Sequence, residues 1–380
     1  MRFTDCIDIT GESCKKFVGK KIYISTGAVD VDHVDLNQIE TINYDTKPSR
    51  ANLITDDNSI LFAKMQETKK VLFIDKGLEK NIYSTGFFSV SPKKNILNKK
   101  CLYHLLESKT FLSQKDKYCS GATQKSITLE GLNKIEITIP NLEDQDKIVK
   151  ILDSIKVIIE SYKKEIKKYD ELIKARFVEM FGDYLKEDRR PLSEVAIITG
   201  GLTKNSNRNT FETKMPYLRV ANVFYNRLDL REILKIGVKE EEIEKTLLQA
   251  GDLLFVEGNG SIEQIGRVAI WDGSIAPILH QNHLIKARFN NEIIAPEYAL
   301  FYFMLQDGRQ QIISKSVSTS GLNTLSVNKV SSLLLPIPPI ALQKQFSVFV
   351  KLVDKSREEV EKSLEKTQQL YDSLMQEYFG

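Results

Sequence analysis

The sequence predicts an α+β protein built by tandem duplication. It contains two mixed α/β modules separated by two long helices, and the helices form an antiparallel coiled coil with pseudo-twofold symmetry. Two observations lead to this class. Segments of the first half recur in the same order in the second half, and each half ends in a long charged segment with regularly spaced apolar residues. Such a repeat determines the architecture before any local element is assigned.

The repeat is clearest at the end of each half. Residues 139–145 (IPNLEDQ) align with residues 337–343 (IPPIALQ) at an offset of 198 residues (343 − 145), and the same offset places Phe181 on Phe379. Earlier segments match at slightly smaller offsets, as expected when loops differ in length. They are 3–11 with 192–200, 23–29 with 217–223, 60–62 with 253–255, and 70–75 with 267–272. The halves are therefore 1–182 and 183–380.

Each half has the same order of elements. Short runs rich in Val, Ile, Tyr and Phe, broken by Gly, Asn and Asp, predict strands and turns. A helix interrupts them at 97–108 in the first half and at 295–305 in the second. An apolar strand, a proline and a long charged helix then complete each half.

The two long helices carry apolar stripes at heptad spacing. About 39 residues at ~1.5 Å each predict rods of roughly 58 Å. Stripes this narrow and long predict that the helices pack on each other; the alternative is that each helix packs on its own module. The first stripe is Leu152, Ile155, Ile159, Tyr162, Ile166, Tyr169 and Ile173. The second is Val350, Val353, Val360, Leu364, Tyr371 and Leu374, interrupted by Arg357 and Thr367.

Composition is that of an ordinary globular protein. With 54 Lys and Arg against 51 Asp and Glu the net charge is +3, and 42% of residues are hydrophobic. No apolar run is long enough to span a membrane, and charges within the first nine residues argue against a secretory signal, so we expect a cytoplasmic protein. The four cysteines have no CxxC spacing and are expected to be thiols.

Motifs of catalysis are missing from the sequence. It has no GxxxxGK[ST] loop, no GxSxG elbow, no HExxH helix and no EF-hand loop. It also lacks the Asn/Asp-Pro-Pro-aromatic tetrapeptide typical of amino-methylating DNA methyltransferases. His280 and His283 are close in sequence, but such a pair is more typical of loop or strand side chains than of a metal site. We therefore predict no catalytic and no metal-binding residues.

The polar and basic loops of both modules are the remaining candidates for function. Gln and Asn can bond adenine, and Arg and Lys can bond guanine or phosphate, so these loops predict contacts with DNA; the alternative is that they are solvated loops. Two modules at a fixed distance suit half-sites about 34–36 Å apart, one turn of the duplex. The candidates are Lys64, Gln66, Thr68, Lys69, Lys70, Gln124, Lys125, Ser126, Arg219, Asn222, Asn259, Ser261, Gln281, Asn282, His283, Lys315, Ser316, Ser318 and Asn323.

These features together resemble the specificity subunit of type I restriction-modification enzymes. The resemblance rests on the segment from GATQKSIT to IPNLEDQ (121–145) and on the long heptad helix that occurs twice. Ser84-Thr85-Gly86-Phe87 and the stretch 335–339 (LPIPP) add to it, and it covers nearly the whole chain. The second half departs from the usual Leu-Glu-Glu-Gln signature, since it has Ala341-Leu342-Gln343.

The resemblance implies target recognition domains at 1–142 and 183–340, each reading one part of a split, asymmetric DNA site. Helices at 143–182 and 341–380 would set the spacing and dock partner subunits. The family's specificity subunit is not catalytic and binds no cofactor. It binds two modification subunits that methylate adenine with S-adenosylmethionine, and motor-nuclease restriction subunits join them, so S-adenosylmethionine, ATP and Mg²⁺ are expected on the partners.

Two other classes of function stay open from the residues alone. One is a coiled-coil scaffold that assembles partners and binds no DNA, which salt-dependent retention on duplex DNA would distinguish. The other is a nuclease with a dispersed metal site, which turnover with added magnesium would reveal.

Overall fold

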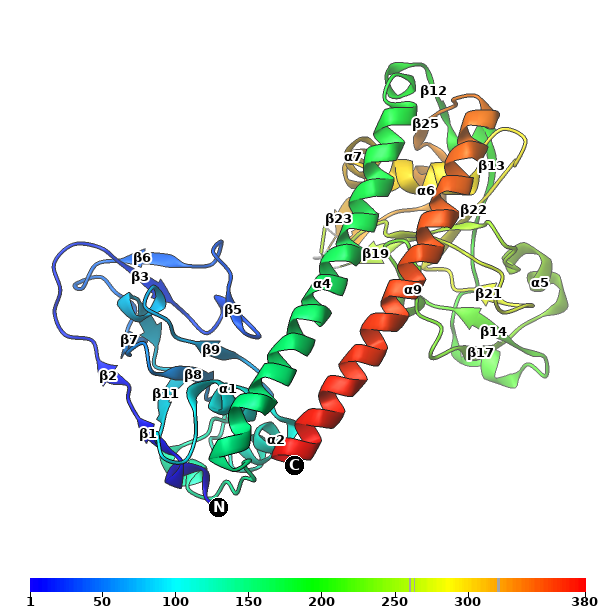
Figure 1. Cartoon of the computed structure of the whole chain (residues 1–380). Coiled ribbons are helices and arrows are strands. Elements are labelled where there is room, and N and C mark those ends of the chain that lie inside the picture. The colour runs from blue at the N-terminus through cyan, green and yellow to red at the C-terminus, as the bar shows by residue number, and fades with distance from the viewer. Residues whose placement is uncertain (260, 263, 320–321) are drawn as a thin grey trace. The chain divides into compact units, whose positions relative to one another are not determined.

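The computed structural model describes residues 1–259, 261–262, 264–319 and 322–380 (Figure 1). The chain divides into two compact units, and each is described by itself. Unit 1 comprises residues 1–164 and 361–380, and unit 2 comprises residues 165–360. Each of the two long helices therefore contributes one part to each unit. Among the described residues, no helix is both long and apolar enough to cross a membrane.

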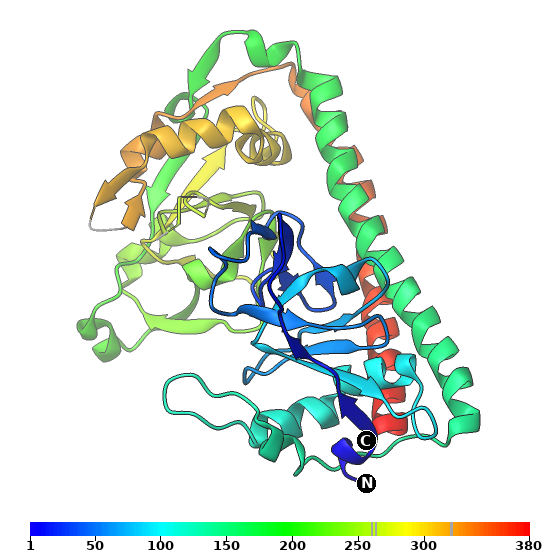
Figure 2. The ribbon, with the colours of Figure 1, turned by 90° about the vertical axis from the view of Figure 1, so that its left-hand side faces the viewer.

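Unit 1 contains two main sheets (Figure 2). The first is antiparallel, in the order β1 (Ile7–Ile9), β11 (Phe87–Pro92), β8 (Ile60–Ala63) and β9 (Val71–Phe73). The second has the order β2 (Glu12–Ser13), β7 (Ala51–Ile54), β10 (Ile82–Ser84), β3 (Lys21–Ile24) and β6 (Glu40–Ile42), with β10 and β3 parallel. A hairpin of β4 (Val29–Asp30) and β5 (His33–Val34) follows β3.

Three short helices and one long helix complete the first half: α1 (Lys99–Glu107), α2 (Lys109–Lys117), α3 (Leu129–Leu132) and α4 (Leu142–Phe181). Asn98 caps α1 by accepting a hydrogen bond from the Cys101 N–H at 2.7 Å. The apolar faces of α1 and α2 pack on the first sheet, where Phe62 and Phe111 meet edge to face at 5.5 Å between ring centroids.

Unit 2 repeats this arrangement. Its four-stranded sheet has the order β13 (Ala196–Gly200), β22 (Leu284–Phe289), β18 (Leu253–Val256) and β20 (Val268–Ile270). A second sheet orders β17 (Leu234–Gly237), β14 (Lys214–Leu218) and β21 (Leu279–His280), with β14 and β21 parallel as β3 and β10 are. Smaller pairings join β12 (Arg189–Pro191) to β25 (Leu334–Pro336), β15 (Val223–Phe224) to β16 (Arg227–Leu228), and β19 (Gly258–Asn259) to β24 (Leu322–Thr324) and β23 (Val317–Thr319).

Helix α5 (Glu240–Thr246) is an addition of the second half. The helices that follow it take the places of α1 to α4, and they are α6 (Pro296–Met304), α7 (Gln306–Lys315), α8 (Val327–Ser331) and α9 (Ile340–Phe379). The helices expected at 97–108 and 295–305 are found as α1 and α6. The short 3-10 segments are Phe3–Asp5, Leu78–Lys80, Tyr184–Lys186, Leu192–Glu194, Ser206–Thr210 and Val220–Asn222. The matching strand orders confirm the tandem duplication.

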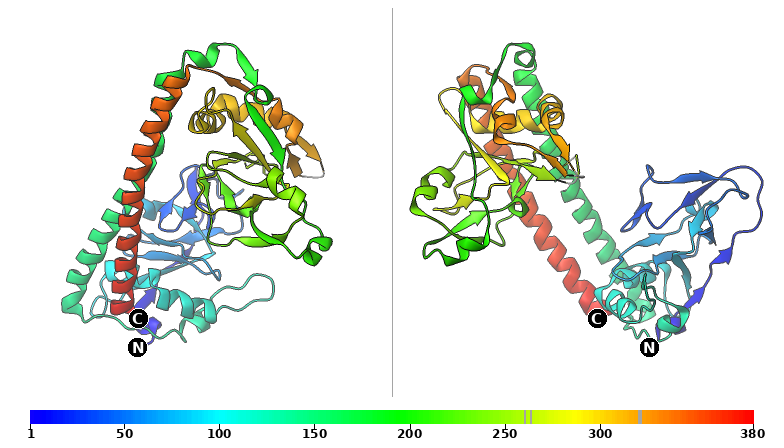
Figure 3. Two further views of the ribbon diagram at one scale, coloured as in Figure 1. Left: turned by 90° about the vertical axis from the view of Figure 1, so that its right-hand side faces the viewer. Right: turned by 180° about the vertical axis from the view of Figure 1, so that it is seen from behind.

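The two long helices, of 40 residues each, run in opposite directions (Figure 3). In unit 1, Leu152 of α4 shares a buried cluster with Tyr371 and Phe379 near the end of α9. In unit 2, the end of α4 meets the start of α9, where the Phe181 and Phe346 rings lie 5.5 Å apart between centroids. Both pairings are antiparallel, as expected from the sequence.

The stripes also pack on the modules, which was the alternative interpretation. In unit 1 the cluster that holds Leu152 includes Leu102 and Leu105 of α1, and in unit 2 Ile173 and Val350 join residues of the sheet and of α6. The ends of the helices therefore have two packing partners. Buried stripe residues are Leu152, Ile155, Ile159, Ile173, Val350, Val353 and Tyr371, whereas Tyr162, Ile166, Tyr169, Val360, Leu364 and Leu374 are half-buried.

One glutamine anchors the start of each long helix. The Gln145 side chain accepts from the Asn98 N–H at 2.8 Å and donates to the carbonyls of Ile96 at 2.8 Å and Pro140 at 3.1 Å. Gln343 accepts from the Ala295 N–H and donates to two carbonyls in the same way, and both glutamines are fully buried. Helix α9 therefore keeps the anchoring glutamine although the residues before it differ.

Candidate nucleic-acid interface

Five of the candidates in unit 1 line a single hollow of about 360 Å³, here called the loop hollow. It lies where the chain leaves β8, beside the turn before β11 and the segment before α3. Arg50, which was not a candidate, also lines it. The candidates present are Lys64, Thr68, Lys70, Gln124 and Ser126.

Backbone hydrogen bonds build the frame of the loop hollow. The Lys64 N–H donates to the Gly86 carbonyl at 2.9 Å, and the Lys64 carbonyl accepts from the Ile127 N–H at 2.8 Å. The Gln66 N–H donates to the Lys125 carbonyl at 3.0 Å. These bonds bring together three segments that are distant in sequence, so candidates from separate loops come to share one surface.

A buried lysine beneath the frame fixes the loop after β8. Lys115 of α2 is 1% exposed, and its ammonium donates to the carbonyls of Met65 at 2.8 Å and Thr68 at 3.1 Å. The Asp116 carboxylate lies 3.1 Å from the same ammonium. Because a buried charge must be bonded to be tolerated, Lys115 ties this loop firmly to α2.

The lysines of the loop hollow are partly withdrawn from water. Lys64 stands over the Phe88 ring at 4.4 Å from its centroid, and burial lowers the pKa of its ammonium. The Lys70 ammonium donates to the Thr26 carbonyl at 2.8 Å. A partly desolvated cation attracts an anion more strongly than a solvated one, so these groups suit a phosphate or an electronegative base edge.

Three candidates of unit 1 lie apart from the loop hollow. Gln66 turns its side-chain amide toward the Asp116 carbonyl, at 3.4 Å. Lys69 is exposed and lines a different hollow, next to α2 and α4. Lys125 is exposed beside the frame.

Unit 2 builds the same frame with different side chains. The Glu257 N–H donates to the His283 carbonyl at 2.9 Å, and the Glu257 carbonyl accepts from the Leu325 N–H at 2.7 Å, as Lys64 does with Gly86 and Ile127. The His283 Nδ1 atom lies 2.7 Å from the Glu257 carboxylate. A lysine beside a glycine in unit 1 is thus replaced by a glutamate paired with a histidine.

Another basic side chain keeps its place in both frames. Arg267 takes the position of Lys70, because their carbonyls accept equivalent bonds from the N–H groups of Val256 and Ala63, both at 2.9 Å. The Arg267 guanidinium also reaches a backbone carbonyl, that of Val220, at 3.4 Å. Our candidate set lacked Arg267, although the alignment of residues 70–75 with 267–272 contained the signal.

Two candidates of unit 2 make hydrogen bonds that stabilise the fold. Asn222 is 3% exposed, and its amide donates to the carbonyls of Asp229 at 2.8 Å and Glu232 at 3.0 Å. Because its side chain is buried and bonded in this way, Asn222 stabilises its loop and is not available to contact DNA. Ser316 bonds the Ile313 carbonyl at 2.7 Å at the end of α7.

The other candidates of unit 2 lie nearer the surface. Arg219 pairs with Glu232 at 2.8 Å. Ser261 is exposed, and Gln281, Asn282, Lys315 and Asn323 are half-buried. Asn259 and Asn323 face each other in the pairing of β19 with β24. The side chains of Asn259 and Ser318 lie outside the described residues.

No group of three or more His, Cys, Asp or Glu side chains able to hold a metal occurs in the described part of the chain. The two neighbouring histidines are separated in the structure. His280 is fully buried with its Nδ1 atom 2.8 Å from the Thr246 carbonyl, whereas His283 is exposed.

Comparison with known proteins shows which family has this architecture. A family model described as the type I restriction modification DNA specificity domain matches residues 7–168 and again residues 187–370. The putative type I restriction enzyme MjaX specificity subunit of Methanocaldococcus jannaschii is 28% identical over 226 residues, which are 59% of this chain and 50% of that protein. The EcoKI specificity subunit of Escherichia coli is 24% identical over 282 residues, 68% of this chain and 59% of that protein.

Solved structures show the same fold. The S subunit of a type I restriction-modification system from M. genitalium aligns over 100% of this chain and 95% of its own, with 18% identity and a TM-score of 0.54. The chain spans only half to three-fifths of the length of the two curated relatives above. Because the family model matches both halves of the duplicated fold, the chain belongs to the family of type I restriction modification DNA specificity domains.

Proposed function

We propose that this chain recognises DNA for a type I restriction-modification complex, with each module reading one part of a bipartite, asymmetric site. The observation that carries this proposal is the frame repeated with different side chains. Lys64 and Gly86 in unit 1 stand where Glu257 and His283 stand in unit 2. Equivalent backbone hydrogen bonds that carry different side-chain donors and acceptors are what two unlike half-sites require.

The paired helices have a role in this proposal. They set the spacing between the two modules and dock two modification subunits, and restriction subunits join that core in the cytoplasm. The chain itself carries no catalytic group and binds no cofactor; S-adenosylmethionine, ATP and Mg²⁺ belong to the partner subunits.

The decisive test is to purify the chain co-expressed with its neighbouring genes and to sequence host DNA for methylation with and without it. We expect a methyltransferase to co-purify and methyladenine at one bipartite motif to disappear on deletion. Partners that co-purify while no motif depends on the chain would overturn the proposal in favour of a scaffold that binds no DNA.

Two variants sharpen the test. Lys64→Ala should weaken reading of one half of the motif and leave the other half unchanged, because Lys64 lies in unit 1 alone. Lys80→Ala, which removes a charge from unit 1 outside the loop hollow, is the matched control. Loss of sequence preference in the methylated motif of the Lys80→Ala variant, or an unchanged methylated motif in Lys64→Ala, would count against this site.

A further inference from the structure

The two units carry equivalent hairpins of opposite charge. In β4–β5, Asp30 pairs with His33, and in β15–β16, Phe224 pairs with Arg227. The Asp35 N–H donates to the Ala28 carbonyl at 2.8 Å, as the Asp229 N–H does to the Asn222 carbonyl. All these pairs share an offset of 194 residues (227 − 33), so Arg227 occupies the position of His33.

The charge difference extends over the whole segment around each hairpin. Residues 25–38 contain three aspartates and neither Lys nor Arg, whereas residues 219–232 contain three arginines, one aspartate and one glutamate. In the second segment both carboxylates form ion pairs with arginines. Asp229 pairs with Arg231 at 2.5 Å, and Glu232 pairs with Arg219 at 2.8 Å.

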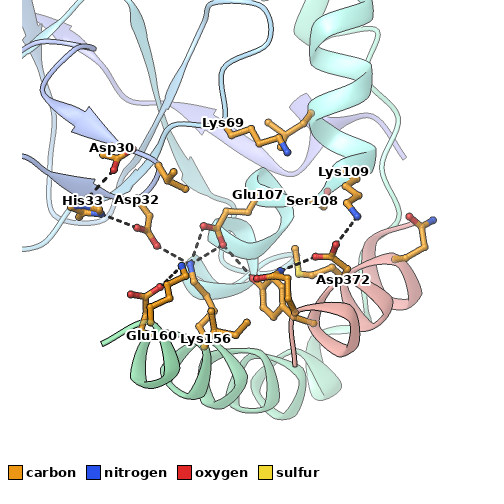
Figure 4. A pocket seen from close by; sticks show the side chains of 18 residues that line it. Asp30, Asp32, His33, Lys69, Glu107, Ser108, Lys109, Lys156, Glu160 and Asp372 are labelled. Carbon is orange, nitrogen blue, oxygen red and sulfur yellow. Dashed lines mark hydrogen bonds and ion pairs between the residues drawn. The ribbon is translucent and has the colours of Figure 1, made fainter. Parts of the chain in front are cut away.

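The acidic hairpin of unit 1 is docked on α4 (Figure 4). The Lys156 ammonium lies 3.0 Å from the Asp32 carboxylate and 2.9 Å from that of Glu107, and it donates to the Tyr103 hydroxyl at 2.8 Å. Burial opposes ionisation of Asp32, but the charge and hydrogen bond of Lys156 outweigh it and lower the pKa of that carboxyl. The turn of this hairpin is therefore held by an ion pair with α4 within unit 1.

The equivalent positions of unit 2 do not carry a carboxylate and an ammonium that could pair. Asn226 takes the place of Asp32, and the helix position that holds Lys156 in α4 holds Asp354 in α9. Asp354 pairs with Arg357 at 2.9 Å. An amide at the turn and a carboxylate on the helix cannot form the ion pair that docks the hairpin of unit 1.

Arginine and aromatic side chains gather at the second hairpin instead. The guanidinium groups of Arg227 and Arg267 lie 5.0 and 5.2 Å from the Phe224 ring centroid, and that of Arg309 lies 5.6 Å from the ring of Tyr225. Stacking on an aromatic face holds a guanidinium in place and leaves its N–H edge for acceptors. Arg227 is exposed, and Arg267 occupies the place of Lys70 in the recognition frame.

We propose that the β15–β16 hairpin of unit 2 contacts the DNA phosphate backbone through Arg227, and that the β4–β5 hairpin of unit 1 makes no such contact. The inference rests on the proposed function, because it assumes that the chain binds DNA. According to this proposal, the hairpin of unit 2 contributes to the electrostatic part of the DNA affinity and the hairpin of unit 1 does not. A duplex is the partner of matching charge, since it presents a dense row of phosphates to the exposed arginine.

The test is the salt dependence of binding to an unmodified mixed-sequence duplex, measured with the full chain between about 50 and 200 mM salt. We expect Arg227→Ala to reduce the slope of log K against log salt by about one, the value for one lost phosphate contact. Arg227→Lys should keep the slope. His33→Ala, the equivalent position in unit 1, should leave it unchanged.

Several results would overturn the inference. The first is an unchanged slope in Arg227→Ala with a native melting temperature, and the second is an equal loss of slope in His33→Ala. The third is an Arg227→Ala variant that loses a co-purifying protein and keeps its DNA slope, which would assign the hairpin to an acidic protein surface. If the wild-type chain shows no salt-dependent binding, the proposed function itself fails, which is a separate result.

Discussion

At the scale of single residues, the paired glutamines explain why one short motif occurs twice. Replacing Gln145 with Leu leaves one N–H and two carbonyls unbonded in the interior, and we expect this to lower the free energy of unfolding by roughly 2–4 kcal/mol. Gln343→Leu should cost a similar amount, since its three bonds are equivalent. Denaturant unfolding measures both, with the exposed Gln369→Leu as control. A loss no larger than that of the control would contradict the anchoring role.

Buried His280 makes stability depend on pH. Burial lowers the pKa of its imidazole from 6.5 to about 4, because the charged form cannot be solvated. Between these values the unfolded chain binds a proton that the folded chain lacks, so stability should rise with pH across this window. Denaturation midpoints measured at intervals from about pH 4 to 7 should follow a shallower curve in His280→Gln than in the wild type. Curves of equal slope would show that other groups cause the dependence.

At the scale of elements, the end of α4 is held by aromatic packing. Phe181 is fully buried, with ring centroids 4.9 Å from Phe177 and 4.7 Å from Tyr298. We expect Phe181→Ala to destabilise the protein by about 3–5 kcal/mol, because it removes a large buried ring and leaves a cavity. The matched control is Val178→Ala on the same helix, where the side chain is 54% exposed. Equal melting temperatures for the two variants would rule out this packing.

At the scale of the whole molecule, unit 1 is built from two distant stretches of chain, residues 1–164 and 361–380. Tyr371, Met375 and Phe379 of α9 belong to the core of unit 1, and the offset of 198 residues makes Ile173, Phe177 and Phe181 their equivalents. A fragment of residues 1–182 would expose the surface that the α9 residues cover. We therefore expect two copies to pair, each supplying its own α4 end to the other, and light scattering should report a dimer.

The same fragment with Phe177 and Phe181 both changed to Ala is the control, and it should be monomeric. A wild-type fragment that is monomeric and melts like the full chain would contradict the exchange of helix ends.

Much of the architecture could be predicted because the duplication and the helix periodicity are both visible in the sequence. The offset of 198 residues, the strand–proline–helix order and the spacing of Leu152, Ile155 and Ile159 are visible without a structure. They led to the two modules and to the antiparallel long helices. The site was only partly predictable, because loops with similar polar composition differ in which side chains face solvent. Asn222 has the composition of a base-reading residue, yet it is buried and bonded to its own loop.

The sequence by itself determined the duplicated α+β fold, since hydrophobic spacing is set by neighbours along the chain and the repeat is found by aligning one half of the sequence with the other. Only the tertiary structure decided which side chains share a surface. It brought Lys64, Gly86 and Ile127 into one frame, and it revealed that Glu257 and His283 fill the equivalent frame. It also showed that Asp32 is bound to Lys156, whereas Arg227 stacks on Phe224 and is exposed to solvent. The reason is physical: burial and charge pairing arise between segments far apart in sequence, and no local pattern records them.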